Sequence, residues 1–390
     1  MGRDEKAMKR MGPLAGIRII ELAGIGPGPM CAMLLADLGA TVLRIDRPQP
    51  AVLGIERPLK YNLLLRNRQT IGLDLKKPGA VDAVLELVEQ SDALIEGFRP
   101  GVTERLGLGP DVCLARNPRL IYGRMTGWGQ SGPLAQTAGH DIGYIAITGV
   151  LNAIGRRDQP PTIPLNLIGD YAGGSLYLAL GLLAGIIEAR SSGQGQVVDA
   201  AVVDGATSLA TTFFGMHAAG MLNPQRGSNM TDSGSHFYDV YECADGQWLA
   251  IGPIEGKFYA QLLQLLEIDP SQLGAQLDPA SWPAAKALFA QRFKTRTRDD
   301  WAARLAPTDA CAAPVLDWAE APEHPHLKAR GTFVEIDGVV QPAPAPRFSR
   351  TIPNAPTPPN PIDPSHTEAT LRDWLGVAKA ANLRRAGVFD

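Results

Sequence analysis

The sequence predicts an α/β fold, in which a parallel sheet covered by helices is followed by a smaller α+β domain. Two observations carry this prediction. Short runs rich in β-branched residues alternate with helical segments along the first half of the chain, and strand-turn-strand patterns followed by amphipathic helices occupy the second half. The chain has 390 residues, of which 45% are hydrophobic and 20% charged, so it is long enough for two or three domains with sizeable cores.

The first half of the chain reads as a series of βαβ units. Residues 17–22 and 41–45 predict two strands, and a Gly/Pro turn and a helix through Leu38 lie between them. Because helices connect the strands, we expect the strands to pair in parallel, with helices on both faces of the sheet. The same alternation continues with a helix at residues 80–90 and strands at residues 70–75, 93–96 and 120–125.

An apolar stretch at residues 171–187 lies between Asp170 and Glu188. A helix needs about 20 apolar residues to cross a bilayer, so this stretch is short for a membrane span. We therefore expect a buried helix here and no membrane partner. Residues 1–10 carry charges of both signs and no apolar run, which is unlike a secretory signal and makes the cytoplasm the expected location.

The second half predicts a smaller domain and a return arm. Residues 237–251 have strand character around a turn, and amphipathic helices follow at residues 257–266 and 282–293. Nine prolines between residues 341 and 364 forbid regular structure and predict an extended arm, which ends in a docking helix near residues 368–375. The predicted division is a large α/β domain at 1–200, a connecting helix and linker at 201–236, a small α+β domain at 237–328, and a proline-rich return arm with a C-terminal helix, packed on the large domain, at 329–390.

The charge and cysteine content exclude several classes of protein. Lys and Arg total 37 against 40 Asp and Glu, which leaves a net charge of -3 and lacks the basic surplus that nucleic-acid binding requires. The four cysteines are far apart and form no CxxC or Cys/His pattern, so neither a zinc site nor a disulfide framework is expected. No nucleic acid, no metal and a reducing compartment are the resulting predictions.

A glycine-rich turn at residues 24–29 has part of a dinucleotide-binding fingerprint, because it follows a strand, precedes a helix and has Asp46 at the end of the next strand. Pro27 and Pro29 remove main-chain N–H groups where a pyrophosphate needs donors. A tight turn that lets the helix pack closely on the sheet is therefore favoured over a nicotinamide cofactor.

Three residues are candidates for acid/base chemistry, and each also has a structural explanation. His140 lies in a glycine-flanked loop after a strand, where active sites of open sheets collect, although a structural histidine is equally compatible with the spacing. Asp170 opens an apolar helix, either as an ordinary first-turn acid or as a catalytic group beside free amides that could stabilise an oxyanion. On the second interpretation, Gly169, Gly173 and Gly174 would let a ligand approach. Glu255 lies on a glycine-containing loop and could equally be a solvated acid.

Basic residues are scattered through the first half of the chain. Most such charges are solvated, but those at strand ends, such as Arg47 and Arg99, lie where a phosphorylated ligand could be held. The other members of the set are Arg44, Arg66, Arg68, Lys76, Lys77 and Arg105.

Several motifs resemble those of the class III CoA-transferase superfamily. They occupy residues 13–23, 35–40, 66–68, 73–76 and 96–102. Within that superfamily, residues 125–130, 138–142 and 239–246 are similar to the alpha-methylacyl-CoA racemase branch. The match extends over roughly residues 12–350.

This resemblance implies a large Rossmann-like domain, a small domain and two connecting arms, with two chains interlocked as a homodimer. It also implies that His140 and Asp170 are the acid/base pair and that Glu255, from the small domain, is the partner of the histidine. Each active site would lie between the large domain of one chain and the small domain of the other. By the same matching, the CoA-binding residues are Arg47, Leu73, Asp74, Leu75, Lys76, Gly97, Phe98, Arg99, Arg105, Gly139, Asp141, Ile142, Gly143 and Tyr144.

The activity that the resemblance implies is interconversion of (R)- and (S)-2-methylacyl-CoA thioesters by 1,1-proton transfer through an enolate. His140 would serve one face of the α-carbon and Asp170 the other, and the amides that open the Asp170 helix would stabilise the enolate oxygen. Coenzyme A is then part of the substrate, and no further cofactor is required. The alternative is a class III CoA-transferase, in which Asp170 attacks the thioester as a covalent nucleophile.

Overall fold

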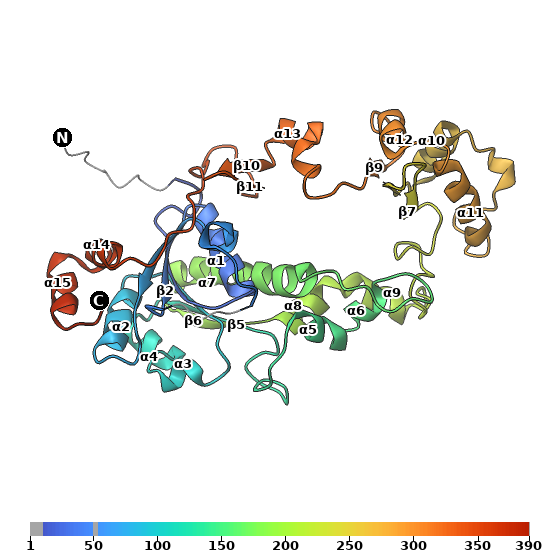
Figure 1. Ribbon diagram of the computed structural model, residues 1–390. Helices are drawn as coiled ribbons and strands as arrows, with labels where there is room; N and C mark the ends of the chain where they lie inside the picture. Colours follow the sequence, from blue (N-terminus) through green and yellow to red (C-terminus); the bar gives the residue numbers. More distant parts are fainter. Residues whose placement is uncertain (1–10, 50–53, 390) are drawn as a thin grey trace, which may run out of the picture. The chain divides into compact units, whose positions relative to one another are not determined.

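The computed structural model describes residues 11–49 and 54–389, so the charged segment 1–10 lies outside the described residues. The chain divides into two compact units, each described here by itself (Figure 1). The first consists of Met1–Ile145, Leu165–Leu209 and His326–Asp390, and the second of Ala146–Pro164 and Ala210–Pro325. The finer division expected at residues 200, 236 and 328 stays a prediction.

A six-stranded sheet forms the centre of the first unit, and its strands run in the order β3-β2-β1-β4-β5-β6. All neighbouring strands are parallel, which confirms the α/β prediction. The order reverses between β1 and β4, and open α/β sheets bind ligands outside the carboxyl ends of the strands at such a point. The strands are β1 (Arg18–Leu22), β2 (Thr41–Asp46), β3 (Arg68–Gly72), β4 (Ala93–Glu96), β5 (Ile121–Thr126) and β6 (Gln196–Ala201).

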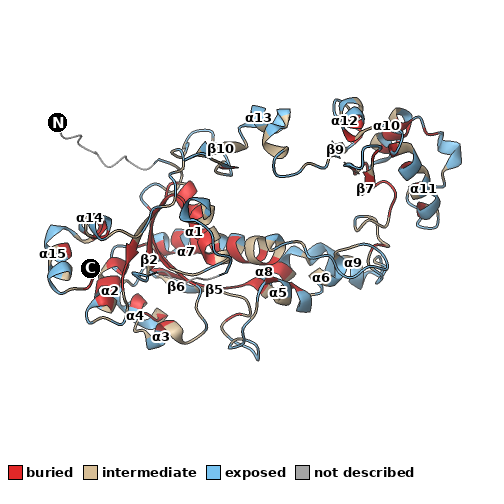
Figure 2. Cartoon of the chain, viewed as in Figure 1, coloured by how far each residue is buried: buried red, intermediate tan, exposed pale blue. Residues whose placement is uncertain are grey.

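Helices cover both faces of this sheet (Figure 2). Successive side chains of a strand point to opposite faces, and Ile19 and Ile20 accordingly belong to different cores. The Ile19 core includes residues of α1 (Pro27–Asp37) and α7 (Tyr177–Ser192). The Ile20 core includes residues of α2 (Ala80–Val88), α4 (Pro110–Arg116), α14 (Pro364–Leu375) and α15 (Val377–Arg385).

Two strands depart from the sequence prediction. β6 was missed because it is an edge strand whose first four side chains are exposed or half-buried, so it lacks the continuous apolar pattern of the other strands. β3 begins earlier than predicted, at Arg68. A charged arginine is typical of a loop in the sequence, but here it is fully buried and paired with Glu21.

The apolar stretch forms one helical run of 26 residues, Leu167–Ser192, made of the π-helical segment η3 (Leu167–Leu176) and α7. Length and composition alone would allow this run to cross a membrane, as they do for many core helices of soluble proteins. The prediction of a buried helix is wrong for one side of it. Leu178 and Leu182 lie in the core, whereas Leu180 and Ile187 are exposed.

The proline-rich segment runs in an irregular course along the start of β3. The Asn67 N–H donates to the Thr357 carbonyl at 3.1 Å, and the Asn67 side-chain oxygen accepts from the Thr357 N–H at 2.7 Å. The docking helix α14 then places Trp374 against the sheet, where its indole N–H donates to Gln69 at 3.0 Å. A hairpin of β10 (Phe333–Ile336) and β11 (Val339–Pro342) precedes this segment.

The second unit contains the predicted hairpin and the two predicted helices. β7 (Asp239–Glu242), β8 (Trp248–Ile251) and β9 (Ala312–Pro314) form an antiparallel sheet. Its core is rich in aromatic side chains from the sheet and from α10 (Gly256–Leu266), α11 (Trp282–Phe293) and α12 (Arg298–Leu305). The shorter helical elements of the chain are η1 (Leu59–Tyr61), η2 (Leu63–Leu65), α3 (Val102–Arg105), α5 (Asp141–Ile147), α6 (Val150–Ala153), α8 (Val202–Leu209), α9 (Thr211–Ala218), η4 (Pro270–Gln272), η5 (Ala321–Glu323) and α13 (Pro325–Arg330).

Candidate active site

The expected CoA-binding residues follow the carboxyl ends of four strands of the sheet, two on each side of β1. Arg47 comes directly after β2, residues 73–76 after β3, residues 97–99 after β4, and residues 139–144 at the end of the loop that follows β5. The carboxyl ends of parallel strands meet at one edge of a sheet, so the fold places these segments along the same edge. This edge is the candidate active site of the first unit.

The loop that carries His140 is held by the ring of Tyr144. Tyr144 packs edge-on against Trp128, with ring centroids 4.7 Å apart, and its hydroxyl donates to the Gly139 carbonyl. A Cβ at Gly127 would lie 1.9 Å from the ring, and one at Gly139 would lie 2.5 Å from it. Glycine is therefore required on both sides of the ring, which fixes the course of the loop just before His140.

His140 immediately precedes α5, and its main chain is ordered by that helix. Its carbonyl accepts from the N–H groups of Gly143 at 2.8 Å and Tyr144 at 3.2 Å. The residue as a whole is exposed. An anchored main chain with an exposed imidazole suits a group that must meet a substrate.

Asp170 lies half-buried in η3. π-Helical segments are rare and occur frequently at functional sites. Its Oδ2 accepts from the Asn166 side chain at 3.3 Å, and a Cβ at Gly26, after β1, would lie 3.4 Å from the same oxygen. Burial raises the pKa of Asp170, Asp141 raises it further, and the Asn166 hydrogen bond and His140 oppose the rise. Asp141, the residue after His140, accepts the Asp170 N–H at 2.7 Å, so the segments that carry the two candidate groups are joined by a hydrogen bond.

Two amides at the start of this segment, those of Gly169 and Asp170, are already hydrogen-bonded, so the prediction that they stabilise an enolate oxygen is wrong for these two. Asp141 accepts the Asp170 N–H at 2.7 Å and also bonds the Gly169 N–H. A buried carboxylate that already satisfies two donors leaves them unavailable to a substrate oxygen.

The glycines beside Asp170 also have a different role from the one predicted. A Cβ at Gly169 would lie 2.2 Å from the Asp141 carboxylate, one at Gly173 would lie 2.7 Å from the Ala206 main chain, and one at Gly174 would lie 2.9 Å from Pro27. These residues are glycines because protein atoms pack against them, and the proposed approach of a ligand over them is wrong.

The Gly/Pro turn is the start of α1, as the tight-turn interpretation expects. Gly26 has a positive φ of 70° and precedes Pro27, the first residue of the helix. The Pro27 carbonyl accepts from the Ser175 hydroxyl at 2.9 Å, so the turn is joined to η3.

Seven of the eight basic residues singled out from the sequence divide into two groups, and the eighth, Lys77, is half-buried and donates to the Gly387 carbonyl at 3.3 Å. Arg44, Arg66 and Arg68 are buried and ion-paired with acids: Arg44 with Glu21 at 3.0 Å and Asp46 at 2.9 Å, Arg66 with Asp37 at 2.5 Å, and Arg68 with Glu21 at 3.0 Å. The second group is exposed at the carboxyl edge and consists of Arg47, Lys76, Arg99 and Arg105. The exposed group is accessible to an anionic ligand, whereas the buried group is not.

Two of the expected contacts have further structural roles. The side chain of Leu73 is buried in the core, so its main chain is the part that a ligand could reach. Asp74 accepts the Lys76 N–H at 3.0 Å and thereby shapes the turn after β3.

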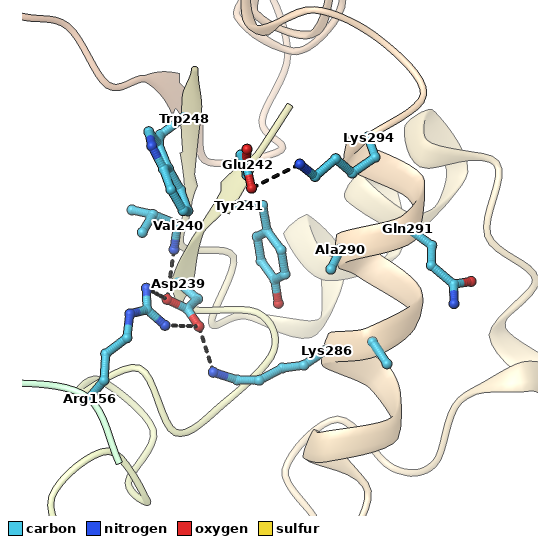
Figure 3. Close-up of a pocket in the computed structure, with 11 residues that line it drawn as sticks. Arg156, Asp239, Val240, Tyr241, Glu242, Trp248, Lys286, Ala290, Gln291 and Lys294 are labelled. Carbon is cyan, nitrogen blue, oxygen red and sulfur yellow. Dashed lines mark hydrogen bonds and ion pairs between the residues drawn. The ribbon is translucent and has the colours of Figure 1, made fainter. Parts of the chain in front are cut away.

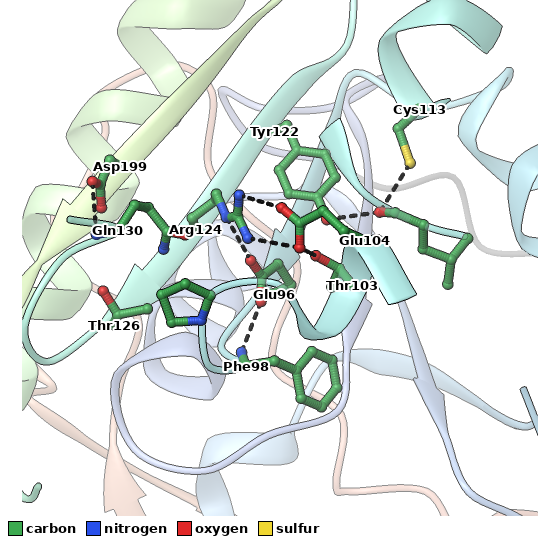
Figure 4. Close-up of polar contacts among 12 residues, drawn as sticks. Glu96, Phe98, Thr103, Glu104, Cys113, Tyr122, Arg124, Thr126, Gln130 and Asp199 are labelled. Carbon is green, nitrogen blue, oxygen red and sulfur yellow. Dashed lines mark hydrogen bonds and ion pairs between the residues drawn. The ribbon is translucent and has the colours of Figure 1, made fainter. Parts of the chain in front are cut away.

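A buried ion network holds the segment after β4, and the sequence motifs did not reveal it (Figure 4). Arg124, from β5, donates to Glu96 at 3.0 Å and to Glu104 at 2.8 Å. Glu96 also accepts the Phe98 N–H at 2.7 Å. One guanidinium therefore ties down both ends of the segment that carries Arg99. Burial raises the pKa of Glu96 to about 7.

Glu255, the remaining candidate, lies in the second unit at the start of α10. Its carbonyl accepts from the N–H groups of Phe258 and Tyr259, both at 3.0 Å, while its carboxylate does not cap the helix. The residue is exposed. Its negative charge raises the pKa of the Cys311 thiol, although burial is the larger cause.

The second unit also has an open groove of about 560 Å³, which was not predicted (Figure 3). Asp239 lies between two cations there, Arg156 at 2.7 Å and Lys286 at 2.5 Å, and Glu242 pairs with Lys294 at 2.8 Å. These charges satisfy one another, and the Arg156 pair ties the segment 146–164 to β7. Across residues 11–49 and 54–389, no group of three His, Cys, Asp or Glu residues could hold a metal ion.

Comparison with known proteins identifies the family. The sequence model of CoA-transferase family III matches residues 14–370. The chain belongs to CoA-transferase family III. The resemblance read from the sequence motifs is thereby confirmed.

Members of CoA-transferase family III to which the chain is similar include proteins named for two activities. The alpha-methylacyl-CoA racemase of Mus musculus is 41% identical over 368 residues, which cover 93% of each chain. The succinyl-CoA–L-malate CoA-transferase beta subunit of Chloroflexus aurantiacus is 30% identical, over 94% of this chain and 95% of the other. The crystal structure of a CAIB/BAIF family protein from Brucella suis has a TM-score of 0.77 at 26% identity, covering 93% of this chain and all of that one (100%).

Proposed function

We propose that this member of CoA-transferase family III is an isomerase that interconverts (R)- and (S)-2-methylacyl-CoA thioesters by 1,1-proton transfer, as an alpha-methylacyl-CoA racemase. The observation that carries the proposal is the 2.7 Å hydrogen bond from the Asp170 N–H to Asp141 Oδ1, which joins the main chain of Asp170 to the residue that follows His140. The 41% identity with the mouse racemase over 93% of both chains supports the same chemistry.

Racemisation removes the α-proton from one face of the substrate and returns a proton to the other face. One base cannot readily serve both faces, so two acid/base groups must flank the α-carbon. His140 serves one face and Asp170 the other, and they exchange roles with the direction of the reaction. Burial raises the pKa of Asp170, which makes its carboxyl a better match to proton transfer near neutral pH.

The enolate oxygen needs hydrogen-bond donors other than those first expected, because Asp141 occupies the amides of Gly169 and Asp170. The main-chain N–H groups of Asp141 and Ile142 open α5 directly after His140, and they would serve as these donors. Loss of one donor to a developing oxyanion typically costs about 2.7–4 kcal/mol of barrier.

The CoA part of the substrate is bound through its phosphates by the exposed cations Arg47, Lys76, Arg99 and Arg105. In this proposal one extended thioester reaches both these cations and the acid/base pair. The chemistry uses the thioester itself to stabilise the carbanion as an enolate, so CoA is part of the substrate and no additional cofactor takes part.

Glu255 would orient the imidazole of His140 and stabilise its cationic form. We propose that it comes from the other chain of an interlocked homodimer, so that each site combines the first unit of one chain with the second unit of its partner. The exposed position of Glu255, with a carboxylate that does not cap its own helix, supports this role.

The exposed side of the long helical run supports the dimer. Leu176 is 52% exposed, Leu180 65% and Ile187 68%, and a stripe of large apolar side chains of this kind marks an interaction surface. Leu180→Glu should convert the protein to a monomer in sedimentation analysis and abolish activity, whereas the same change at exposed Val112 of α4 should not. A Leu180→Glu protein that remains a dimer would contradict this arrangement.

A CoA-transferase is the alternative, in which Asp170 attacks the thioester and forms a covalent acyl-enzyme. The loop 252–256 supports the racemase, since it supplies Glu255 in place of a run of glycines that would cover such an intermediate.

The two functions predict different outcomes with a 2-methylacyl-CoA thioester in deuterium oxide. A racemase incorporates deuterium at the α-carbon and inverts its configuration without any acceptor acid. A transferase leaves the α-proton in place, moves CoA to an added carboxylic acid and can be trapped as an Asp170 adduct. The second pattern would overturn the proposal. The cytoplasmic location stays a prediction.

A further inference from the structure

Asp141 joins the two segments that carry the acid/base pair. It follows His140 directly in the sequence, and it is 7% exposed. Its Oδ1 accepts the Asp170 N–H at 2.7 Å, and the carboxylate also bonds the Gly169 N–H. The residue after one acid/base group thus binds the main chain of the other.

The structure makes room for this carboxylate. A Cβ on Gly169 would lie 2.2 Å from Asp141 Oδ1 and 2.8 Å from its carboxyl carbon, distances that real atoms do not adopt. A glycine at this position, inside a helical segment where glycine is otherwise unfavourable, is explained by the carboxylate that lies against it.

We propose that Asp141 is a positioning residue for proton transfer, whose carboxylate sets the spacing and orientation of His140 and Asp170 by binding the main chain at residues 169–170. This inference rests on the racemase activity proposed above. The role proposed here belongs to the Asp141 side chain, which contacts protein amides and not the substrate, and it is separate from the role proposed above for the Asp141 main-chain N–H. The other oxygen of that side chain, Oδ2, is buried and has no hydrogen-bond partner among the described residues.

The same carboxylate tunes the electrostatics of the site. Its negative charge acts on Asp170 in the direction opposite to that of His140. Loss of the Asp141 charge should therefore make Asp170 a stronger acid. Other titratable groups lie on η3 and on the elements packed against it. They are Tyr171 on η3, Cys31 and Asp37 on α1, Tyr177, Glu188 and Arg190 on α7, Tyr122 and Arg124 on β5, Asp199 on β6, and Asp204 on α8, and Tyr144 lies on α5.

Two substitutions separate the anchoring role from the electrostatic role. Asp141→Asn keeps an oxygen that can accept both N–H groups but removes the charge. Asp141→Ala removes the anchor as well. Misplacement of reacting groups by about 1 Å can cost about 100-fold in rate, so Asp141→Ala should lower kcat by about 10- to 100-fold while KM changes far less.

The pH profile of kcat/KM distinguishes this role from a merely structural one, because a purely structural residue would not shift it. Asp170 must be ionised to act as a base, so the acidic limb of kcat/KM should shift to lower pH in Asp141→Asn. Asp141→Asn should also retain most of the kcat that Asp141→Ala loses. Gly169→Ala disturbs the same contact between Asp141 and residues 169–170 and should lower kcat as Asp141→Ala does. The matched control is Asp111→Asn, because Asp111 is an exposed acid at the start of α4.

The assay is deuterium incorporation at the α-carbon, measured with the full-length protein and with circular dichroism as a check on folding. Amide hydrogen exchange at residues 169 and 170 adds a measurement that does not depend on activity. Protection of these amides should be kept in Asp141→Asn and lost in Asp141→Ala. Two results would overturn this role and leave the racemase proposal intact. One is an Asp141→Asn variant that has the wild-type turnover and an acidic limb of kcat/KM at the wild-type pH. The other is an Asp141→Ala variant with an unchanged kcat. A wild-type protein that exchanges no α-proton would overturn both.

Discussion

Replacement of Arg124 by methionine would test whether the buried ion network holds the segment after β4. The methionine keeps the apolar stem of the side chain but removes the guanidinium. Glu96, which is 0% exposed, then loses its ionic partner, while its hydrogen bond from the Phe98 N–H remains. The pair with Glu104 matters less, because that carboxylate is 44% exposed.

The expected cost follows from the burial of Glu96. Removal of one partner from a buried ion pair typically destabilises a protein by about 3–5 kcal/mol, because an uncompensated charge is left behind. Arg116→Met is a matched control, since Arg116 pairs with Glu89 at the surface, where the two side chains are 42% and 31% exposed. An exposed pair contributes at most about 1 kcal/mol. The loss of unfolding free energy in Arg124→Met should therefore be at least about three times the loss in Arg116→Met.

The cost should also depend on pH in a definite direction. Burial raises the pKa of Glu96 from 4.5 to about 7, so the stability that its protonated form contributes is fully present below pH 4.5 and is lost as pH rises through about 7. Without Arg124 the carboxyl should hold its proton to still higher pH. Arg124→Met should therefore destabilise the protein more at pH 8 than at pH 6.

The measurement is equilibrium unfolding in urea at pH 6 and pH 8, together with KM for an acyl-CoA substrate. KM should rise because Arg99 and Arg105 lie on the segment that the network holds. Glu96→Gln combined with Arg124→Met should recover part of the lost stability, since no buried charge remains. A variant no less stable than Arg116→Met at pH 8, or equally destabilised at both pH values, would refute this reasoning.

Three further outcomes are expected. His140→Ala should bind a CoA thioester with nearly unchanged affinity in calorimetry but abolish α-proton exchange, and unchanged exchange would remove its assigned role. Gly127→Ala should lower the free energy of unfolding by about 1–3 kcal/mol, as overpacking typically does, because the new Cβ would lie 1.9 Å from the Tyr144 ring; thermal unfolding would measure this, and a wild-type melting temperature would contradict it. Burial lowers the pKa of His236 from 6.5 to about 4, so stability linked to its neutral form is present above pH 6.5 and is lost as pH falls through about 4. His236→Gln should accordingly flatten the pH dependence of the melting temperature between pH 4 and pH 6.5. A slope equal to that of the wild type would argue against a lowered pKa for His236.

Much of the fold could be predicted because its signals are local. The β-branched runs of β1, β2, β4 and β5, the helix Trp282–Phe293 and the hairpin of β7 and β8 were recognised from apolar periodicity within a few residues. β6 was missed because an edge strand with exposed side chains carries little of that periodicity. The candidate acid/base residues were assigned through their motifs, since spacing alone left each with a structural explanation.

The sequence by itself determined the α/β class, the family and the residue types available for chemistry, because periodicity and motifs are properties of neighbouring residues. Only the tertiary structure decided which polar groups are already engaged. Arg66 is taken up by Asp37 and Gln341, and the amide of Asp170 is taken up by Asp141. Hydrogen bonds and ion pairs need atoms within about 3 Å of one another. Segments far apart in the sequence reach that distance only when the chain has folded.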